Sequence, residues 1–179
     1  MKKFKESKIL PKYIEQSVIT EMLDKARNEQ KKFSYRNYII LMTLARTGMR
    51  SADIANLKKQ DIQRDSIIVR QGKGKKDRVI PLDHDLGNLL GLYADRLSPN
   101  DRIFNIKIRQ IRNVVYKYAT DKSIHPHTYR HSFAVHCIKS GMNIRSLQKI
   151  LGHSDLATTA VYLDLVGKDV IDDFKKVEW

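Results

Sequence analysis

Apolar residues recur with the 3.6-residue period of an α-helix along most of this chain, and no other feature constrains its fold as strongly. The strongest such segment, residues 34–47, carries Ile39 and Leu44 and is followed by Gly48, a residue typical of helix C-termini. Its most apolar stretch, residues 38–45, is far shorter than the roughly 20 residues that a membrane-spanning helix needs. The pattern therefore predicts a globular, mainly helical protein.

The remaining elements follow from the same reading, with one interruption by β-strands. Residues 66–70 and 78–81 read as strands, and the Gly-Lys-rich turn at 72–77 between them predicts an antiparallel hairpin. Residues 98–101 read as a loop. Further helices are expected at residues 16–30, from Ser51, and at 83–97, 106–119, 127–140, 144–151, 156–165 and 168–177. The expected fold class is mainly α with a small antiparallel β-sheet (α+β).

The charge of the chain indicates a polyanionic partner. Lys and Arg total 34 against 20 Asp and Glu, a formal net charge of +14, and nucleic acid is the commonest partner of so basic a domain. An anionic membrane surface would instead call for a basic amphipathic helix, whereas the basic residues here are scattered along the whole chain. The alternative that the charge serves only solubility stays open.

Cysteine usage and the first residues bear on the compartment. Cys137 is the only cysteine, so an intrachain disulfide is impossible, which fits a reducing cytoplasm. The start is basic but has no apolar run behind it, so it does not read as a signal peptide. We therefore expect a cytoplasmic protein with no membrane association.

Two segments towards the C-terminus carry side chains suited to phosphodiester chemistry. His127 and Arg130 are three residues apart on an expected helix and so share one face. His153 lies a little upstream of Tyr162. Arginine neutralises phosphate oxygens, histidine handles a proton and a tyrosine hydroxyl can attack, and Arg50 supplies a second arginine.

Each candidate also has a purely structural explanation. Arg50 can be a surface residue beyond a helix end, and Lys73 can mark a flexible hairpin tip. His127 can cap a helix after a proline, and with Arg130 it can form a solvated polar face. His153 can be a capping or core histidine, and a core position is the default for Tyr162. Their joint occurrence in this order, rather than any one of them, indicates a functional site.

With these residues in this order, the chain resembles the catalytic domain of the tyrosine recombinases, also called the phage integrase family, over about residues 15–166. The matching segments are Thr47-Gly48-Met49-Arg50 with Leu57 downstream, Gly72-Lys73-Gly74, His127-Thr128-Tyr129-Arg130-His131, and Leu151-Gly152-His153 leading to Tyr162. By analogy, the family's catalytic set falls on Arg50, Lys73, His127, Arg130, His153 and Tyr162. One departure is Asp53, where relatives usually have Glu; the shorter carboxylate can still buttress Arg50.

The resemblance implies a site-specific DNA recombinase that works through a covalent intermediate. Tyr162 would attack the scissile phosphate, form a 3′-phosphotyrosyl bond and release a 5′-hydroxyl that later reseals a strand. Arg50 and Arg130 would bind the non-bridging oxygens and stabilise the transition state. Bond energy is conserved in this exchange, so no ATP is needed.

The family also implies roles for the other residues. Lys73 would protonate the leaving 5′-oxygen, His127 would act as general base towards Tyr162, and His153 would donate a hydrogen bond to the phosphate. A tyrosine with an ordinary pKa of about 10 needs such help at neutral pH. Two arginines already supply positive charge and no carboxylate cluster accompanies them, so neither a metal nor another cofactor is expected.

The resemblance divides the chain into a basic lead-in at 1–14, the catalytic domain at 15–166 and a C-terminal tail at 167–179. The tail is expected to dock on a neighbouring protomer or to pack on its own domain. Family members usually carry a separate N-terminal DNA-clamping domain, so the chain is either a short member or part of a longer one. The implied partners are double-stranded DNA and further copies of the chain, assembled on DNA as a tetrameric synapse.

Two alternatives to a recombinase remain. A non-catalytic DNA-binding regulator could share the fold, but it would have no reason to keep Tyr162 with the complete set. A type IB topoisomerase-like enzyme would share the tyrosine chemistry. The segment Leu151-Gly152-His153 favours a recombinase over a topoisomerase.

Overall fold

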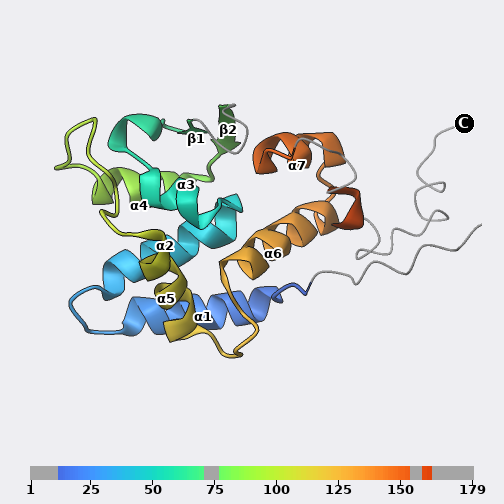
Figure 1. Cartoon of the computed structure of the whole chain (residues 1–179), viewed down its shortest axis with the longest axis horizontal. Helices are drawn as coiled ribbons and strands as arrows, with labels where there is room; N and C mark the ends of the chain where they lie inside the picture. Colours follow the sequence, from blue (N-terminus) through green and yellow to red (C-terminus); the bar gives the residue numbers. More distant parts are fainter. Residues whose placement is uncertain (1–11, 71–76, 154–158, 163–179) are drawn as a thin grey trace, which may run out of the picture.

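The computed structural model describes residues 12–70, 77–153 and 159–162 (Figure 1). It confirms a mainly helical fold with one small sheet, in which β1 and β2 pair antiparallel with Val69 opposite Arg78. The elements are α1 (Gln16–Asn28), α2 (Ser34–Thr47), α3 (Ser51–Asn56), the 3-10 turn η1 (Lys59–Asp61), β1 (Ser66–Val69), β2 (Arg78–Pro81), α4 (His84–Tyr93), α5 (Ile108–Tyr118), α6 (Pro126–Lys139) and α7 (Ile144–Leu151).

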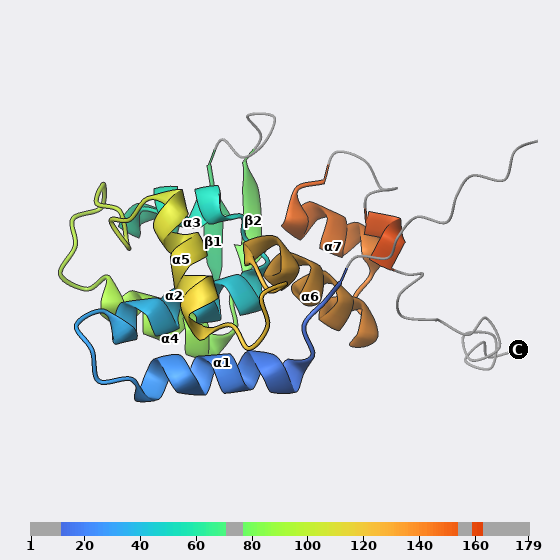
Figure 2. The same ribbon diagram turned by 60° about the horizontal axis from the view of Figure 1, so that its bottom comes forward.

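Helix α2 lies at the centre of the fold because it is apolar on nearly every side. Ile39, Ile40, Leu41 and Leu44 are all 0% exposed, and α2 packs against α1, α4, α5 and α6. Fully burying one such side chain contributes about 1.5–3 kcal/mol. In both views α2 lies between α1 and α3 (Figures 1 and 2).

Gly48 ends α2 and allows α6 to approach it. Its φ of +59° is left-handed, and its N–H donates to the Leu44 carbonyl at 3.2 Å. A Cβ at this position would lie 2.6 Å from Cδ1 of Phe133 in α6. Two features therefore require glycine at this position: the left-handed backbone angle and the close contact with Phe133. The chain then turns directly into Arg50, the residue before α3.

Helix boundaries differ from the sequence prediction where tertiary contacts intervene. The predicted bounds of α2 and α7 are confirmed, but α4 ends at Tyr93 rather than at Leu97. Lys59 Nζ donates to the carbonyls of Asp95 and Leu97 at 2.8 and 2.7 Å, which satisfies these groups outside a helix. The η1 turn that carries Lys59 was not predicted from the sequence.

The sheet and α7 lie at the same end of the molecule in both views, with α1 at the opposite edge (Figure 2). Strand β2 packs directly against α7, and α6 crosses from the central helices to α7. A second apolar cluster lies there, formed by Ala134, Val135, Ile138, Leu147, Leu151 and Tyr162. This end of the molecule gathers most of the predicted site residues.

Some predictions fall outside the residues that the structure describes. These are Lys73, the tail at 167–179 and residues 1–11 of the lead-in. Residues 159–162 are helical, within the helix predicted at 156–165. Across the described ranges, no helix is long and apolar enough to cross a membrane.

Candidate functional site

Arg50 has a buried donor with no partner in the part of the chain that the structure describes. Its backbone N–H is held by Oδ2 of Asp53 at 3.2 Å, so the carboxylate buttresses the main chain of Arg50. Nη1 of its guanidinium is buried and has no hydrogen-bond partner among the described residues. Burial lowers the pKa of Arg50, and the neighbouring charge of Arg78 acts in the same direction, while Asp53 opposes both. An unpaired buried donor of this kind is costly unless an anion completes it.

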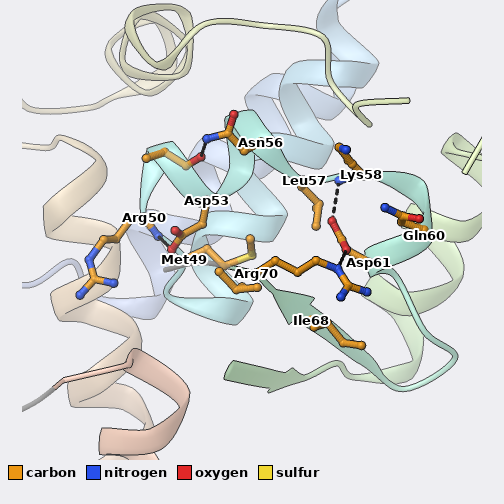
Figure 3. Close-up of a pocket in the computed structure, with 12 residues that line it drawn as sticks. Met49, Arg50, Asp53, Asn56, Leu57, Lys58, Gln60, Asp61, Ile68 and Arg70 are labelled. Carbon is orange, nitrogen blue, oxygen red and sulfur yellow. Dashed lines mark hydrogen bonds and ion pairs between the residues drawn. The ribbon is translucent and has the colours of Figure 1, made fainter. Parts of the chain in front are cut away.

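A cavity of about 700 Å³ opens beside Arg50, between α3, η1 and β1 (Figure 3). Figure 3 shows the Arg50 side chain at the edge of this cavity, directed away from Asp61 and Arg70. Asp61 is itself occupied, since it accepts from Arg70 Nε at 2.7 Å and from the Lys58 N–H at 3.2 Å. The Arg50 guanidinium therefore lies at the edge of this cavity and points away from the ion pair of Asp61 and Arg70.

Arg130 is anchored between two helix C-termini. It is 5% exposed and donates Nη1 to the Gly48 carbonyl at 2.8 Å and Nη2 to the Leu151 carbonyl at 2.5 Å. These carbonyls lie at the ends of α2 and α7, where the helix dipole favours a cation. Burial, then the charges of Arg50 and Arg78, lowers the pKa of Arg130 to about 10, so it stays protonated at neutral pH.

His153 is a neutral imidazole held by a hydroxyl group. It follows Gly152, whose φ of +65° ends α7, and its Nδ1 lies 2.9 Å from Oγ1 of Thr159. Burial, reinforced by the charges of Arg130 and Arg50, lowers the pKa of His153 to about 4. When Nδ1 accepts the Thr159 hydroxyl proton, Nε2 carries the hydrogen and can donate it to a ligand.

Tyr162 is buried, and its hydroxyl is already paired. The residue is 3% exposed, and its Oη lies 2.8 Å from Nδ1 of His131. Burial raises the pKa of Tyr162, while the charge of Arg130 opposes this. Burial, with the charges of His127, Arg130 and His125, lowers the pKa of His131. Both shifts favour a neutral pair in which Tyr162 keeps its proton.

His127 shares a cavity with Arg50, whereas the Tyr162 hydroxyl is hydrogen-bonded to His131. It is exposed on the first turn of α6, with its ring 6.2 Å from that of His125. A cavity of about 630 Å³ is lined by Arg50, His127, Arg109, Arg112 and His125, among others. The α6 N-terminus is capped by His125, whose Nδ1 accepts from the Thr128 N–H at 3.3 Å, so His127 is not its cap.

The sequence reasoning missed two residues of this site, Arg78 and His131. Arg78 lies two residues before Ile80 on β2, so the two side chains share a face, and the burial of Ile80 shows that this face is the inward one. His131 follows Arg130 directly, and only the packing of residues 159–162 against α6 reveals its contact with Tyr162. Among the residues the structure describes, no three His, Cys, Asp or Glu side chains are grouped as metal ligands would be.

The fold is a helical domain in which the charges of Arg50 and Arg130 act on the neutral His153, and the charge of Arg130 also acts on Tyr162. The chain belongs to the phage integrase family, whose model matches residues 12–167. It is similar to the tyrosine recombinase of Pseudothermotoga lettingae, with 36% identity over 180 residues that cover 94% of this chain and 61% of the relative. The tyrosine recombinase XerA of Thermococcus kodakarensis is 34% identical over 167 residues, 86% of this chain and 58% of the relative.

Solved structures of a recombinase and of an integrase catalytic domain superpose on this chain. The crystal structure of XerA recombinase superposes with a TM-score of 0.74 at 28% identity, covering 97% of this chain and 68% of that chain. The catalytic domain of bacteriophage HP1 integrase superposes with a TM-score of 0.71 at 25% identity, covering 93% of this chain and 95% of that one. The chain thus spans about three fifths of the curated relatives and nearly all of an integrase catalytic domain.

Proposed function

We propose that the chain is the catalytic part of a site-specific DNA recombinase that cleaves and rejoins strands through a 3′-phosphotyrosyl intermediate. The observation that carries the proposal is the buried Nη1 of Arg50, which has no partner among the described residues and belongs to a charge that lowers the pKa of Arg130. An anion is the natural partner of that donor. The names of the relatives and the net charge of +14 support a DNA phosphate as the anion.

In the proposed reaction, Tyr162 Oη attacks phosphorus, and the bond from phosphorus to the 5′-oxygen breaks. Arg50 and Arg130 bind the non-bridging oxygens, whose charge grows in the transition state. Arg130 has five N–H groups and the two bonds to carbonyls leave others for phosphate. Because Tyr162 is buried against His131, its hydroxyl must first leave that hydrogen bond.

The proton transfers are assigned to the remaining residues of the set. Lys73 gives a proton to the leaving 5′-oxygen, and His127 accepts the proton of Tyr162 once the tyrosine has left His131. His153 donates from Nε2 to a phosphate oxygen, a role that suits a neutral ring with Nδ1 engaged by Thr159. None of these steps draws on a metal or another cofactor.

The proposed partner is double-stranded DNA, on which copies of the chain assemble as a tetrameric synapse. The cavity between Arg50 and His127 is lined by Arg109 and Arg112, which extend the positive charge beyond the reacting phosphate. A single cysteine fits activity in the cytoplasm. The proposed domain division keeps residues 15–166 as the catalytic unit and 167–179 as a docking tail.

A nicked DNA pool tests this proposal without a known target site. The chain is mixed with duplexes that carry a randomised segment and a nick, from which a short cleaved fragment diffuses away and prevents religation. We expect DNA that stays attached to protein through denaturing electrophoresis, with or without EDTA, and that shares a sequence on recovery. Binding with no covalent product would support a regulator instead, and attachment with no shared sequence would support a topoisomerase-like enzyme.

A further inference from the structure

Arg78 is a buried arginine at the site to which the proposed reaction gives no role. Its side chain is 8% exposed, and its Nη2 donates to Oδ2 of Asp53 at 2.6 Å, where Asp53 is itself 9% exposed. Its Nε donates to the Ile150 carbonyl at 3.0 Å, in the last turn of α7. One guanidinium therefore joins β2, α3 and α7.

Through Asp53, Arg78 reaches the main chain of Arg50. The same Oδ2 atom that accepts from Arg78 also accepts the Arg50 N–H at 3.2 Å. Asp53 lies in the first turn of α3, where a carboxylate is favoured by the helix dipole. Fixing this carboxylate fixes the position from which the Arg50 side chain extends.

At its other end, Arg78 packs under the turn that leads to His153. A Cβ on Gly152 would lie 2.8 Å from Cδ of Arg78, so the Arg78 side chain and the Gly152 backbone are in close contact. The Ile150 carbonyl that Arg78 holds lies just before this turn. A shift of Arg78 would therefore move the backbone that carries His153.

We propose that Arg78 is a positioning residue for strand cleavage: it holds Asp53 and the C-terminal end of α7 so that Arg50 and His153 converge on one phosphate. The inference rests on the proposed function. The charge of Arg78 also lowers the pKa of three neighbouring residues, Arg50, Arg130 and His153. Arg78 is paired with the Asp53 carboxylate, whereas Arg130 is held by neutral carbonyls, so Arg78 suits support rather than contact with DNA.

The test compares Arg78→Met and Arg78→Lys with the wild type on one nicked duplex recovered from the randomised pool. Misplacing catalytic groups by about 1 Å can cost about 10²-fold in rate, so we expect Arg78→Met to lower the cleavage rate at saturating DNA by about that factor. Lysine keeps an ion pair with Asp53 and should recover part of this loss. DNA affinity should change by less than about threefold, because phosphate contacts elsewhere dominate binding.

A double variant separates positioning from general stability. Asp53→Asn combined with Arg78→Met should cleave no more slowly than Arg78→Met alone, since both changes break the same bridge. Arg46→Met is the control: Arg46 makes an ion pair of the same 2.6 Å length with Asp83, and Arg46 lines neither of the two cavities beside Arg50, so its loss should leave cleavage unchanged. Thermal melting of every variant identifies any that is unfolded at the assay temperature.

The outcomes are distinct. Cleavage by folded Arg78 variants at the wild-type rate, or a loss of DNA affinity equal to the loss of rate, would overturn the positioning role alone. Additive losses in the double variant would also overturn it. No covalent product from the wild-type chain would remove the proposed function and this inference with it.

Discussion

Arg130 illustrates how a cation is kept charged while it is buried. Desolvation disfavours its charged form, yet two carbonyls at helix C-termini accept its N–H groups and offset part of that penalty. Arg50 is less fully paired, because its Nη1 has no hydrogen-bond partner within residues 12–70, 77–153 and 159–162. The two arginines therefore differ in how they are held: the fold fixes the Arg130 guanidinium through two carbonyls, and the Arg50 guanidinium keeps a donor available for a ligand.

Arg130→Lys should lower the cleavage rate far more than the retained charge suggests. A lysine ammonium cannot reproduce the planar guanidinium, which bridges Gly48 and Leu151 and has further N–H groups for the proposed phosphate contact. Losing one preorganised donor to an oxyanion costs about 10²–10³ in rate. Covalent-complex formation at saturating DNA measures this effect; a Lys variant that cleaves at a near-normal rate would show that Arg130 contributes only general electrostatics.

His153 should make the stability of the domain depend on pH. Its pKa is about 4 in the folded protein against an ordinary value of 6.5, so the unfolded chain binds more protons between these values. The free energy of unfolding should therefore fall as the pH is lowered from about 6.5 to about 4. Urea unfolding of the wild type and of His153→Gln across this range measures the effect, and the variant should lose part of the decline. Parallel curves for the two proteins would contradict it.

At the scale of elements, the sequence predicted the helices whose boundaries are set locally. Helices α2 and α7 were both predicted with the observed bounds, and each is followed by a glycine. The structure adds a second local signal for α7, the cap by Asn143 at its start. The end of α4 depends on Lys59, which is distant in sequence, and periodicity alone could not have located it. Local sequence signals therefore predict the boundaries of a helix only where no tertiary contact determines its end.

The same distinction applies to the site. Arg50 and Arg130 were found because short motifs surround them, and the structure brings them together with His153 and Tyr162. Arg78 and His131 contact residues far along the chain, Ile150 and Tyr162, so these contacts become visible only in three dimensions.

Two glycines give an element-scale prediction with an internal control. Gly48→Ala should destabilise the protein by about 1–3 kcal/mol, because alanine is strained at φ +59° and its Cβ would meet Phe133 at 2.6 Å. Gly91→Ala, inside α4 with no atom within 4 Å of the new Cβ, should stabilise it by about 0.5–1 kcal/mol. Urea unfolding measures both. Equal effects of the two substitutions would contradict this account of the α2–α6 contact.

For the whole molecule, the net charge of +14 predicts that DNA binding depends steeply on salt. Each phosphate neutralised contributes about 0.9 to the slope of log affinity against log salt concentration. Titration of duplex DNA at several salt concentrations should give a slope that corresponds to several phosphates. An affinity that does not respond to salt, or a preference for anionic lipid vesicles over duplex DNA, would contradict a nucleic-acid partner.

The most direct test of the central claim is the covalent attachment of DNA to Tyr162. Tyr162→Phe removes the nucleophilic oxygen and the hydrogen bond to His131, and keeps the buried ring. We expect the wild type to form a DNA complex that survives denaturing electrophoresis on the nicked duplex pool. The Phe variant should form none while binding DNA with nearly the same affinity. A denaturation-resistant complex formed by Tyr162→Phe would show that another residue is the nucleophile, and it would contradict the account of this site.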